Sequence, residues 1–351
     1  MKLLIVTQTV DTEDPILGFF VRWIEEFAKN CSEVHVLALN VGLYKLPDNV
    51  FVHCLGKSEG RSKIIWLWRL WRHSFTLRHS YDAVFVHMNP EYVVFGSLVW
   101  NLLGKKTSLW YAHGTVSTKL KLATIISSRI FTSTEKGFRI NSPKRHIVGQ
   151  GIDTDFFKST TDKRPNDRLE LLTVGRISPA KNLLFLISTC ATLKQKGIPF
   201  HFTIVGEPQS YAEQAYKTQL LEYITEHNLE SEVSLVGTVS QKDLPKTLTQ
   251  HDVFISAGAT GSLDKALLEA VACGIITLSS NEAFRDLVES EAELVCFSEG
   301  NEGELVELLC TIHADILQYA LVQKSLTEKV KHAHSLQKFI PKLITHYESK
   351  R

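Results

Sequence analysis

Short apolar runs recur along this chain and alternate with longer segments in which apolar residues follow a helical period. In the first half the runs are LLIV at 3–6, VHVLAL at 34–39, AVFVH at 83–87 and SLWYA at 108–112. In the second half they are LELLTVG at 169–175, FHFTIVG at 200–206, VSLVG at 233–237, DVFIS at 252–256 and GIITL at 274–278. Strands separated by helices predict parallel sheets covered by helices, an α/β fold.

The pattern restarts after one polar, strand-poor stretch, STTDKRPNDR at 159–168, which we interpret as an interdomain linker. A length of 351 residues also favours two domains. We therefore predict two doubly wound, Rossmann-like domains, 1–158 and 169–334, that face a central cleft in which a ligand binds. The final segment, 335–351, has apolar residues at helical spacing despite Pro341, and we expect this helix to pack back towards the first domain.

Composition excludes several classes of protein. With 44% hydrophobic and 22% charged residues the chain has the balance of a globular protein and neither disorder nor a fibrous structure. Its six cysteines form no CxxC pair, which suits a reducing compartment and disfavours structural zinc. No stretch approaches the ~18 apolar residues of a membrane-spanning helix, and the first apolar run is too short for a signal peptide. We expect a cytoplasmic protein.

Charge is divided unevenly between the two halves. Residues 1–151 contain 19 Lys and Arg against 11 Asp and Glu, a net charge of +8, whereas the remaining residues carry −7. The segment 62–80 predicts a helix that interleaves tryptophans with cations: Trp66, Trp68 and Trp71 with Lys63, Arg69, Arg72 and Arg78.

A basic, tryptophan-rich helix is typical of binding to an anionic membrane surface, which predicts peripheral attachment to the inner face of the membrane. The alternative is a helix whose apolar stripe packs on its own sheet while the cations face water. We expect no nucleic-acid partner, because the tryptophans gather on one helix and are not spread as stacking platforms.

Two cations follow the predicted strand at 169–175, just before a helix that begins near Asn182. Arg176 and Lys181 would meet the free N–H groups of the helix N-terminus, where an anion such as a diphosphate is favoured. Taken alone, the pair fits ordinary surface charges as well.

The stretch from Gly261 to Gly274 is a loop that continues into a helix. The helix, from about Leu263, is rich in small residues that allow close packing on a sheet. Glu269 is the acid in its middle, and a buried carboxylate there needs donors, for which vicinal ribose hydroxyls are suited. The alternative is that Glu269 faces water.

The segments GRISPAKN, IVGEP, VSLVG, DVFIS and LLEAVACG, in this order and spacing, resemble the retaining glycosyltransferases of family 4. GIDTDFF at 151–157 is similar to the interdomain segment of that family, and in the first half the resemblance rests on YAHG at 111–114. It implies the GT-B architecture. It also implies an enzyme, a hexosyltransferase that moves a sugar from a nucleoside-diphosphate sugar to a glycan or lipid-linked glycan acceptor, in cell-surface polysaccharide synthesis.

The resemblance also assigns residues. Arg176 and Lys181 would hold the donor diphosphate and stabilise it as it leaves, and Glu269 would hold the ribose. Gly206 would approach the nucleotide with its backbone. His113, at the end of a predicted strand, would lie near the transferred sugar as a third catalytic residue. Acceptor-binding residues stay unassigned, although the loop 9–18 is expected to contribute.

One departure from the family lies in the loop. The family has Glu-x7-Glu, but Gly261 stands eight residues before Glu269. We expect Thr260, Gly261, Ser262 and Asp264 to bind the donor sugar instead, through backbone N–H groups and the Asp264 carboxylate. No Asp-x-Asp stands near the site, so we expect no metal and no other cofactor.

Two other functions fit the same architecture. One is a nucleotide-sugar 2-epimerase of GT-B fold, which would have no reason to carry the basic aromatic helix. The other is a non-catalytic subunit that binds a partner glycosyltransferase, which the missing acid at 261 favours and the retained Arg176, Lys181 and Glu269 disfavour.

Overall fold

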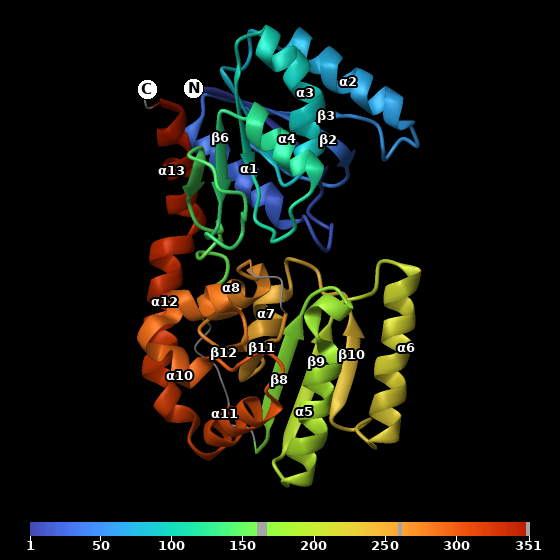
Figure 1. Cartoon of the computed structure of the whole chain (residues 1–351), viewed down its shortest axis with the longest axis vertical. Helices are drawn as coiled ribbons and strands as arrows, with labels where there is room; N and C mark the ends of the chain where they lie inside the picture. The colour runs from blue at the N-terminus through green and yellow to red at the C-terminus, as the bar shows by residue number, and fades with distance from the viewer. Residues whose placement is uncertain (160–166, 259–261, 349–351) are drawn as a thin grey trace. The chain divides into compact units, whose positions relative to one another are not determined.

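The structure, a computed structural model, describes residues 1–159, 167–258 and 262–348 (Figure 1). It divides into two compact units, the first made of Met1–Gly151 with His334–Arg351 and the second of Ile152–Ala333. The segment 152–158, which the sequence pattern placed in the first domain, lies in the second unit because Ile152 and Phe157 are buried in that unit's core. Most of the predicted linker, 160–166, lies outside the described residues.

The first unit is built on a seven-stranded parallel sheet in the order β3-β2-β1-β4-β5-β6-β7. The strands are β1 (Lys2–Val10), β2 (Glu33–Val41), β3 (Val50–Cys54), β4 (Ala83–His87), β5 (Lys106–Trp110), β6 (Arg129–Thr132) and β7 (Arg145–Ile147). The central strands read as continuous apolar runs because both faces of the sheet are covered.

Helices cover the two faces of this sheet in different ways. α1 (Phe19–Asn30) and α13 (Leu336–Glu348) pack on the face that contains Leu3 and Ile5 of β1. The opposite face, with Leu4 and Val6, carries α2 (Lys63–Thr76), α3 (Pro90–Leu102) and α4 (Thr118–Ile126) (Figure 1).

The C-terminal helix α13 is a built-in part of the first unit. Its Phe339 packs against Trp23 of α1, with ring centroids 4.5 Å apart, and the Trp23 indole N–H donates to the Gly151 carbonyl at 2.8 Å. Pro341 lies inside the helix, and Lys342 Nζ donates to the Ile147 carbonyl at 3.0 Å. The apolar stripe expected at 335–351 therefore completes the core beside α1.

The second unit is built on a five-stranded parallel sheet in the order β10-β9-β8-β11-β12. Its strands are β8 (Leu169–Val174), β9 (Phe200–Val205), β10 (Val233–Gly237), β11 (Val253–Ser256) and β12 (Ile276–Ser279). Its helices are α5 (Leu183–Gln195), α6 (Tyr211–Glu226), α7 (Leu244–Thr249), α8 (Lys265–Ala272), α9 (Glu282–Val288), α10 (Ala292–Val295), α11 (Glu302–Ala314) and α12 (Tyr319–His334).

Within the described ranges, no single helix is both long and apolar enough to cross a membrane. By length and composition alone, one bent pair, Glu302–Ala314 with Ile316–His334, meets that criterion.

Candidate functional site

The sheet of the second unit changes direction between β8 and β11. From β8 the chain adds β9 and β10 on one side, and then returns to place β11 on the other side. Such a switch point opens a crevice at the carboxyl ends of the two strands, where ligands bind in open α/β sheets. The segments that follow β8 and β11 contain most of the residues singled out from the sequence.

Two glycines allow the backbones after β8 and β9 to meet. Gly175 has φ +150° and Gly206 has φ +142°, values that favour glycine. A Cβ on Gly206 would lie 1.9 Å from the Gly175 carbonyl oxygen. The Gly206 N–H donates to the Gly237 carbonyl at 2.7 Å, so the carbonyl and Cα of Gly206 are what it can offer to a nucleotide.

Lys181 reaches across the switch point to Asp264. Its chain lies over Gly175, where a Cβ would come within 2.7 Å of Lys181 Cε, and its Nζ lies 2.5 Å from Asp264 Oδ2. Asp264 also accepts from Ser256 Oγ at 3.3 Å and caps α8 by accepting the Ala266 N–H at 3.1 Å. An ammonium has three donors, so Lys181 can hold Asp264 and a ligand oxygen together.

Arg176 is ion-paired as well. The side chain is half exposed, and its Nε lies 3.2 Å from Glu213 Oε1 in the first turn of α6. Each of the two predicted anion-binding cations is therefore held by an acid, and an anion must compete with Glu213 or share Arg176 with it.

At the helix N-terminus expected beside these cations, one backbone N–H group already has a hydrogen-bond acceptor. Asn182 adopts a left-handed conformation, φ 52°, and α5 begins only after it. The Leu184 N–H donates to Tyr216 Oη at 3.0 Å. Burial raises the pKa of Tyr216, which keeps its hydroxyl protonated. The prediction that free N–H groups of this helix would meet the anion is wrong for Leu184, because Tyr216 accepts its hydrogen bond.

Glu269 lies in the middle of α8 and its side chain is only 3% exposed. The alternative that it faces water is therefore excluded. Lys265 Nζ, one turn earlier, lies 4.0 Å from Glu269 Oε1. One turn later, burial raises the pKa of Cys273 to about 12, and the charge of Glu269 adds to this effect. Ala270 and Ala272 are buried against the sheet, as their size predicts.

The loop between β11 and α8 is described only in part. Thr260 and Gly261 lie outside the described residues. Ser262 is buried, and its carbonyl accepts from Asn281 Nδ2 at 2.9 Å. Asn281 also caps α9 through the Ala283 and Phe284 N–H groups.

His113 belongs to the first unit and follows β5. Its backbone N–H donates to the Gly137 carbonyl at 2.9 Å, and its ring is exposed. Ring Nδ1 accepts the Thr115 N–H at 3.1 Å, so in the neutral imidazole the proton lies on Nε2. His113 therefore presents an N–H donor outward. In the loop 9–18, Asp14 accepts two backbone N–H groups of its own turn, whereas Asp11 accepts the N–H groups of Glu13 and of Leu43, which follows β2.

Sequence reasoning missed Glu213, Ser256 and Asn281. Glu213 stands three residues after Ser210, the spacing of a capping box, and its N–H donates to Ser210 Oγ at 3.2 Å. That spacing predicts the start of a helix but not the ion pair of Glu213 with Arg176. Asn281 has the cap preference of its residue type, yet its bond to Ser262 depends on the fold.

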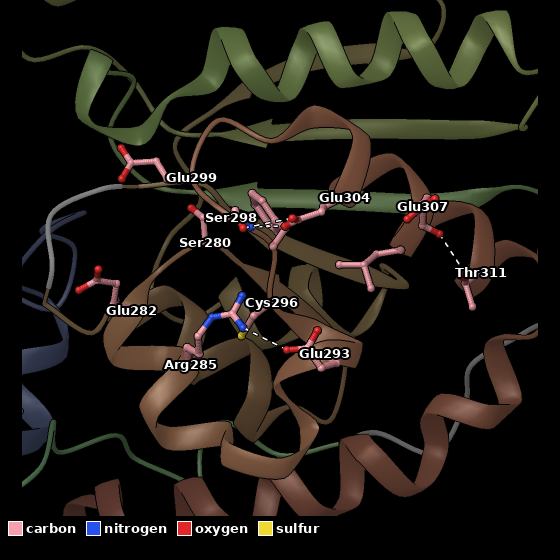
Figure 2. A pocket seen from close by; sticks show the side chains of 12 residues that line it. Ser280, Glu282, Arg285, Glu293, Cys296, Ser298, Glu299, Glu304, Glu307 and Thr311 are labelled. Atoms are coloured by element: carbon pink, nitrogen blue, oxygen red, sulfur yellow. Dashed lines mark hydrogen bonds and ion pairs between the residues drawn. The ribbon is translucent and has the colours of Figure 1, made fainter.

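A pocket elsewhere in the second unit does not suit an anion. Figure 2 shows this pocket of about 770 Å³, in which Arg285 points towards Glu293, at 3.4 Å, and Glu304 is bonded to Ser298. Glu304 also accepts from Asn301 at 2.7 Å, as part of the cap of α11. Several other glutamates line the walls: Glu282, Glu299 and Glu307. This excess of carboxylates repels a diphosphate, and none of the predicted donor residues lines the pocket.

Comparison with known proteins agrees with the fold and with the motifs. Residues 153–318 match the family described as glycosyl transferases group 1. WcaL of Escherichia coli (strain K12), which bears the name of a colanic acid biosynthesis glycosyltransferase, is 28% identical over 209 residues, 57% of this chain and 50% of WcaL. The amylovoran biosynthesis glycosyltransferase AmsK of Erwinia amylovora is 27% identical over 201 residues, 54% of this chain and 48% of AmsK. The matched part thus spans about half the length of these relatives.

Solved structures share the fold over the whole chain. HepE of Anabaena, determined in complex with UDP and glucose, has a TM-score of 0.78 at 17% identity and covers 100% of both chains. TarM has a TM-score of 0.78 at 10% identity and covers 99% of both chains. The predicted GT-B fold is confirmed.

Proposed function

Because residues 153–318 match the glycosyl transferases group 1 family, we propose that this protein transfers a sugar from a nucleoside-diphosphate sugar to a glycan or lipid-linked glycan acceptor. The names of WcaL and AmsK support a role in the synthesis of a cell-surface polysaccharide. The observation that carries the proposal is the Lys181–Asp264 pair, which spans the switch point above Gly175.

The donor would lie along the carboxyl ends of β8, β9 and β11. Arg176 and Lys181 bind the diphosphate, Gly206 meets the nucleotide with its backbone, and Glu269 accepts from the ribose hydroxyls. The sugar lies towards the loop before α8, where Asp264 takes the place of the missing acid, together with the segment 260–262. HepE, which shares the fold, binds UDP and glucose, and this supports a uridine nucleotide as the first donor to test.

Transfer would proceed with retention of the anomeric configuration. As the bond between the sugar and the diphosphate breaks, negative charge grows on the leaving diphosphate, and Arg176 and Lys181 stabilise it. Preorganised charges contribute most where charge develops. His113 would donate from Nε2 to a sugar oxygen. The two cations supply the charge that a bound metal would otherwise provide, so we expect full activity in the presence of EDTA.

The acceptor side of the reaction would lie at a membrane. α2 packs on its own sheet through Leu70 and, in part, through Trp66 and Leu67, as the alternative interpretation expects, but its other apolar side chains stay exposed. Ile64 is 81% exposed and Trp68 56% exposed, while Leu102 on α3 is 88% exposed. We call the exposed apolar side chains of these two helices the α2–α3 face: Ile64, Trp68, Phe75, Phe95, Leu98 and Leu102.

Cations border the α2–α3 face. Arg72 lies over the Trp68 ring at 5.4 Å, and Arg78 lies over the Phe75 ring at 4.6 Å. The Trp71 N–H donates to the Phe95 carbonyl at 2.8 Å and joins the two helices. Apolar side chains flanked by cations suit the interface of an anionic bilayer, and this supports peripheral binding at the cytoplasmic side.

Donor binding is tested by thermal unfolding of the whole chain with a panel of UDP- and GDP-sugars. A ligand at 100 times its dissociation constant stabilises the folded state by roughly 2.7 kcal/mol. We expect one nucleotide class to raise the melting temperature and to show transfer to lipid-linked glycan acceptors. If no nucleotide of either class changes the unfolding, the proposed transfer is wrong.

Membrane binding is tested by sedimentation with vesicles. Binding should require anionic lipid and weaken between about 0.05 M and about 0.5 M salt, because exposed charges are screened. Equal binding to neutral vesicles at every salt concentration would contradict the proposal.

A further inference from the structure

One face of α6 contacts the segments that follow β8 and β9. Glu213, Tyr216 and Lys217 stand three and four residues apart, a spacing that places side chains on one face of a helix. Glu213 lies beside Arg176, and Tyr216 accepts a backbone N–H at the start of α5. Lys217 Nζ donates to Glu207 Oε2 at 2.8 Å, in the segment after β9. This face of α6 therefore supports the backbone that we assign to the donor at three points.

The Glu213 carboxylate is fixed by the start of its own helix. Its Oε2 accepts the Gln209 N–H at 2.7 Å, and its own N–H donates to Ser210 Oγ at 3.2 Å. The other oxygen, Oε1, lies 3.2 Å from Arg176 Nε. The Glu213 side chain is only 13% exposed, whereas that of Arg176 is 50% exposed. The cap of α6 thus holds a carboxylate in a set place beside a cation that is otherwise open to solvent.

Contact at Nε leaves the outer edge of the Arg176 guanidinium for a ligand. A guanidinium has five N–H donors in one plane, one on Nε and two on each Nη. The edge formed by the two Nη atoms matches two oxygens of a phosphate. Arg69 in the first unit shows the opposite arrangement, because Glu59 lies 3.0 Å from its Nη1 and 2.9 Å from its Nη2 and so occupies that edge.

We propose that Glu213 is a positioning residue for sugar transfer, which holds Arg176 by Nε and turns its Nη edge towards the donor diphosphate. Glu213 itself does not touch the donor. A guanidinium that is already oriented loses less conformational entropy when it meets the leaving diphosphate. The negative charge of Glu213 opposes binding of the diphosphate, and the orientation of Arg176 offsets this cost. The inference rests on the proposed function, because it requires Arg176 to bind the diphosphate.

Glu213→Gln tests this role with a side chain of the same length. The amide has one oxygen, so it cannot accept from Gln209 and from Arg176 at once. We expect kcat for the release of UDP or GDP from the sugar donor to fall about tenfold, because the cation is no longer oriented. Affinity for free UDP and GDP, measured by calorimetry, should not weaken, because a competing charge is removed as well.

Glu222→Gln changes an exposed acid of the same helix and is the matched control. It should have the kcat and the nucleotide affinity of the unaltered chain. Unchanged kcat in Glu213→Gln would overturn the proposal.

A double variant separates positioning of Arg176 from capping of α6. If Glu213 acts through Arg176, Glu213→Gln should change kcat by no more than about twofold in a chain that already carries Arg176→Gln. If Glu213 acts only by holding the start of α6, kcat should fall by the same factor with and without Arg176→Gln, and this result would overturn the proposal. Melting temperatures of the four chains measure the loss of the cap separately.

The same assays separate this inference from the proposed transfer. A chain that releases no nucleoside diphosphate from any UDP- or GDP-sugar would refute transfer itself. A chain that transfers sugar, loses activity in Arg176→Gln and keeps it in Glu213→Gln would refute only the positioning role.

Discussion

The two units of this protein differ in net charge and in tryptophan content. All six tryptophans lie in residues 1–151, which carry a net charge of +8, whereas the rest of the chain carries −7. In the second unit the cations of the candidate site are paired with acids, Lys181 with Asp264 and Arg176 with Glu213. In the first unit large apolar side chains remain exposed on α2 and α3.

The same contrast holds between two helices. α8 has eight residues, of which six are buried, including Glu269. α2 has fourteen residues, of which two are buried. Both sequences are rich in apolar residues, but α2 carries them around more of its circumference than a single sheet can cover. The surplus leaves an exposed apolar surface on α2, whereas α8 buries its apolar residues in the core of the second unit.

The largest expected effect concerns Lys181, whose ion pair lies in the second unit. Lys181→Ala should lower the rate of transfer by on the order of 10²-fold or more, because one donor to the leaving diphosphate is lost. The measurement is the steady-state rate with saturating acceptor. Lys196→Ala, an exposed lysine at the end of α5 in the same unit, is the control. Near-normal activity of Lys181→Ala would refute its role.

Gly206→Ala tests how strongly the close backbone contact between Gly206 and Gly175 affects the stability of the second unit. The added Cβ should destabilise that unit by about 3 kcal/mol, because it meets a carbonyl oxygen and a strained φ. Calorimetry of the whole chain should show the loss, while tryptophan fluorescence, which reports on the first unit, should not.

Gly197→Ala is the matched control for this change. Gly197 also has a positive φ, +71°, but a Cβ there meets nothing within 4 Å. The cost should be only about 1 kcal/mol. Equal losses in the two variants would show that φ, and not the approach of the two backbones, sets the cost.

Lowering the pH should destabilise the first unit through His334. Burial lowers the pKa of His334 to about 4, and its Nδ1 accepts the Gln150 N–H at 3.2 Å. The unfolded chain binds this proton below about pH 6.5 and the folded chain does not until about pH 4, so stability is complete above 6.5 and falls as the pH drops. Between pH 7 and pH 5 the first unit should lose roughly 2 kcal/mol. Urea unfolding followed by tryptophan fluorescence measures it. His334→Asn should reduce the pH dependence but not remove it, because burial also lowers the pKa of His53 in the same unit to about 4.

The smallest expected effect concerns the α2–α3 face. Trp68→Ser should weaken sedimentation with anionic vesicles about tenfold, because one large apolar side chain no longer enters the interface. Leu294→Ser, an exposed apolar residue of the second unit, should leave binding unchanged. Similar losses in both variants would mean that binding is not confined to the first unit.

The sequence pattern predicted most of the strands and missed β3, β6 and β7 of the first sheet. β1, β2, β4 and the strands of the second unit coincide with apolar runs. β6 and β7, with the sequences RIFT and RHI, are short and begin with arginine. β3, VFVHC, lies at an edge of the sheet and is only partly buried. β3 and β7 are edge strands, which need fewer apolar residues, whereas β6 is buried but has only four residues, so periodicity gives all three little signal.

The sequence likewise predicted some residues of the candidate site but not the residues that contact them. Lys181, Asp264 and Glu269 could be named because each stands at a fixed distance from a strand or glycine that the pattern reveals. Their partners could not, since the Lys181–Asp264 contact joins residues 83 positions apart and depends on the order of β8 and β11 in the sheet. Neither Glu213 beside Arg176 nor Tyr216 at the start of α5 follows from local sequence.

The return of α13 to the first unit has a consequence for protein synthesis. Trp23 packs against Phe339, and the ribosome makes the entire second unit between these two residues. A nascent chain can complete the five-stranded sheet of the second unit while the surface of α1 around Trp23 still lacks its cover. The unit whose synthesis begins first thus cannot complete its core until the last helix of the chain has been made.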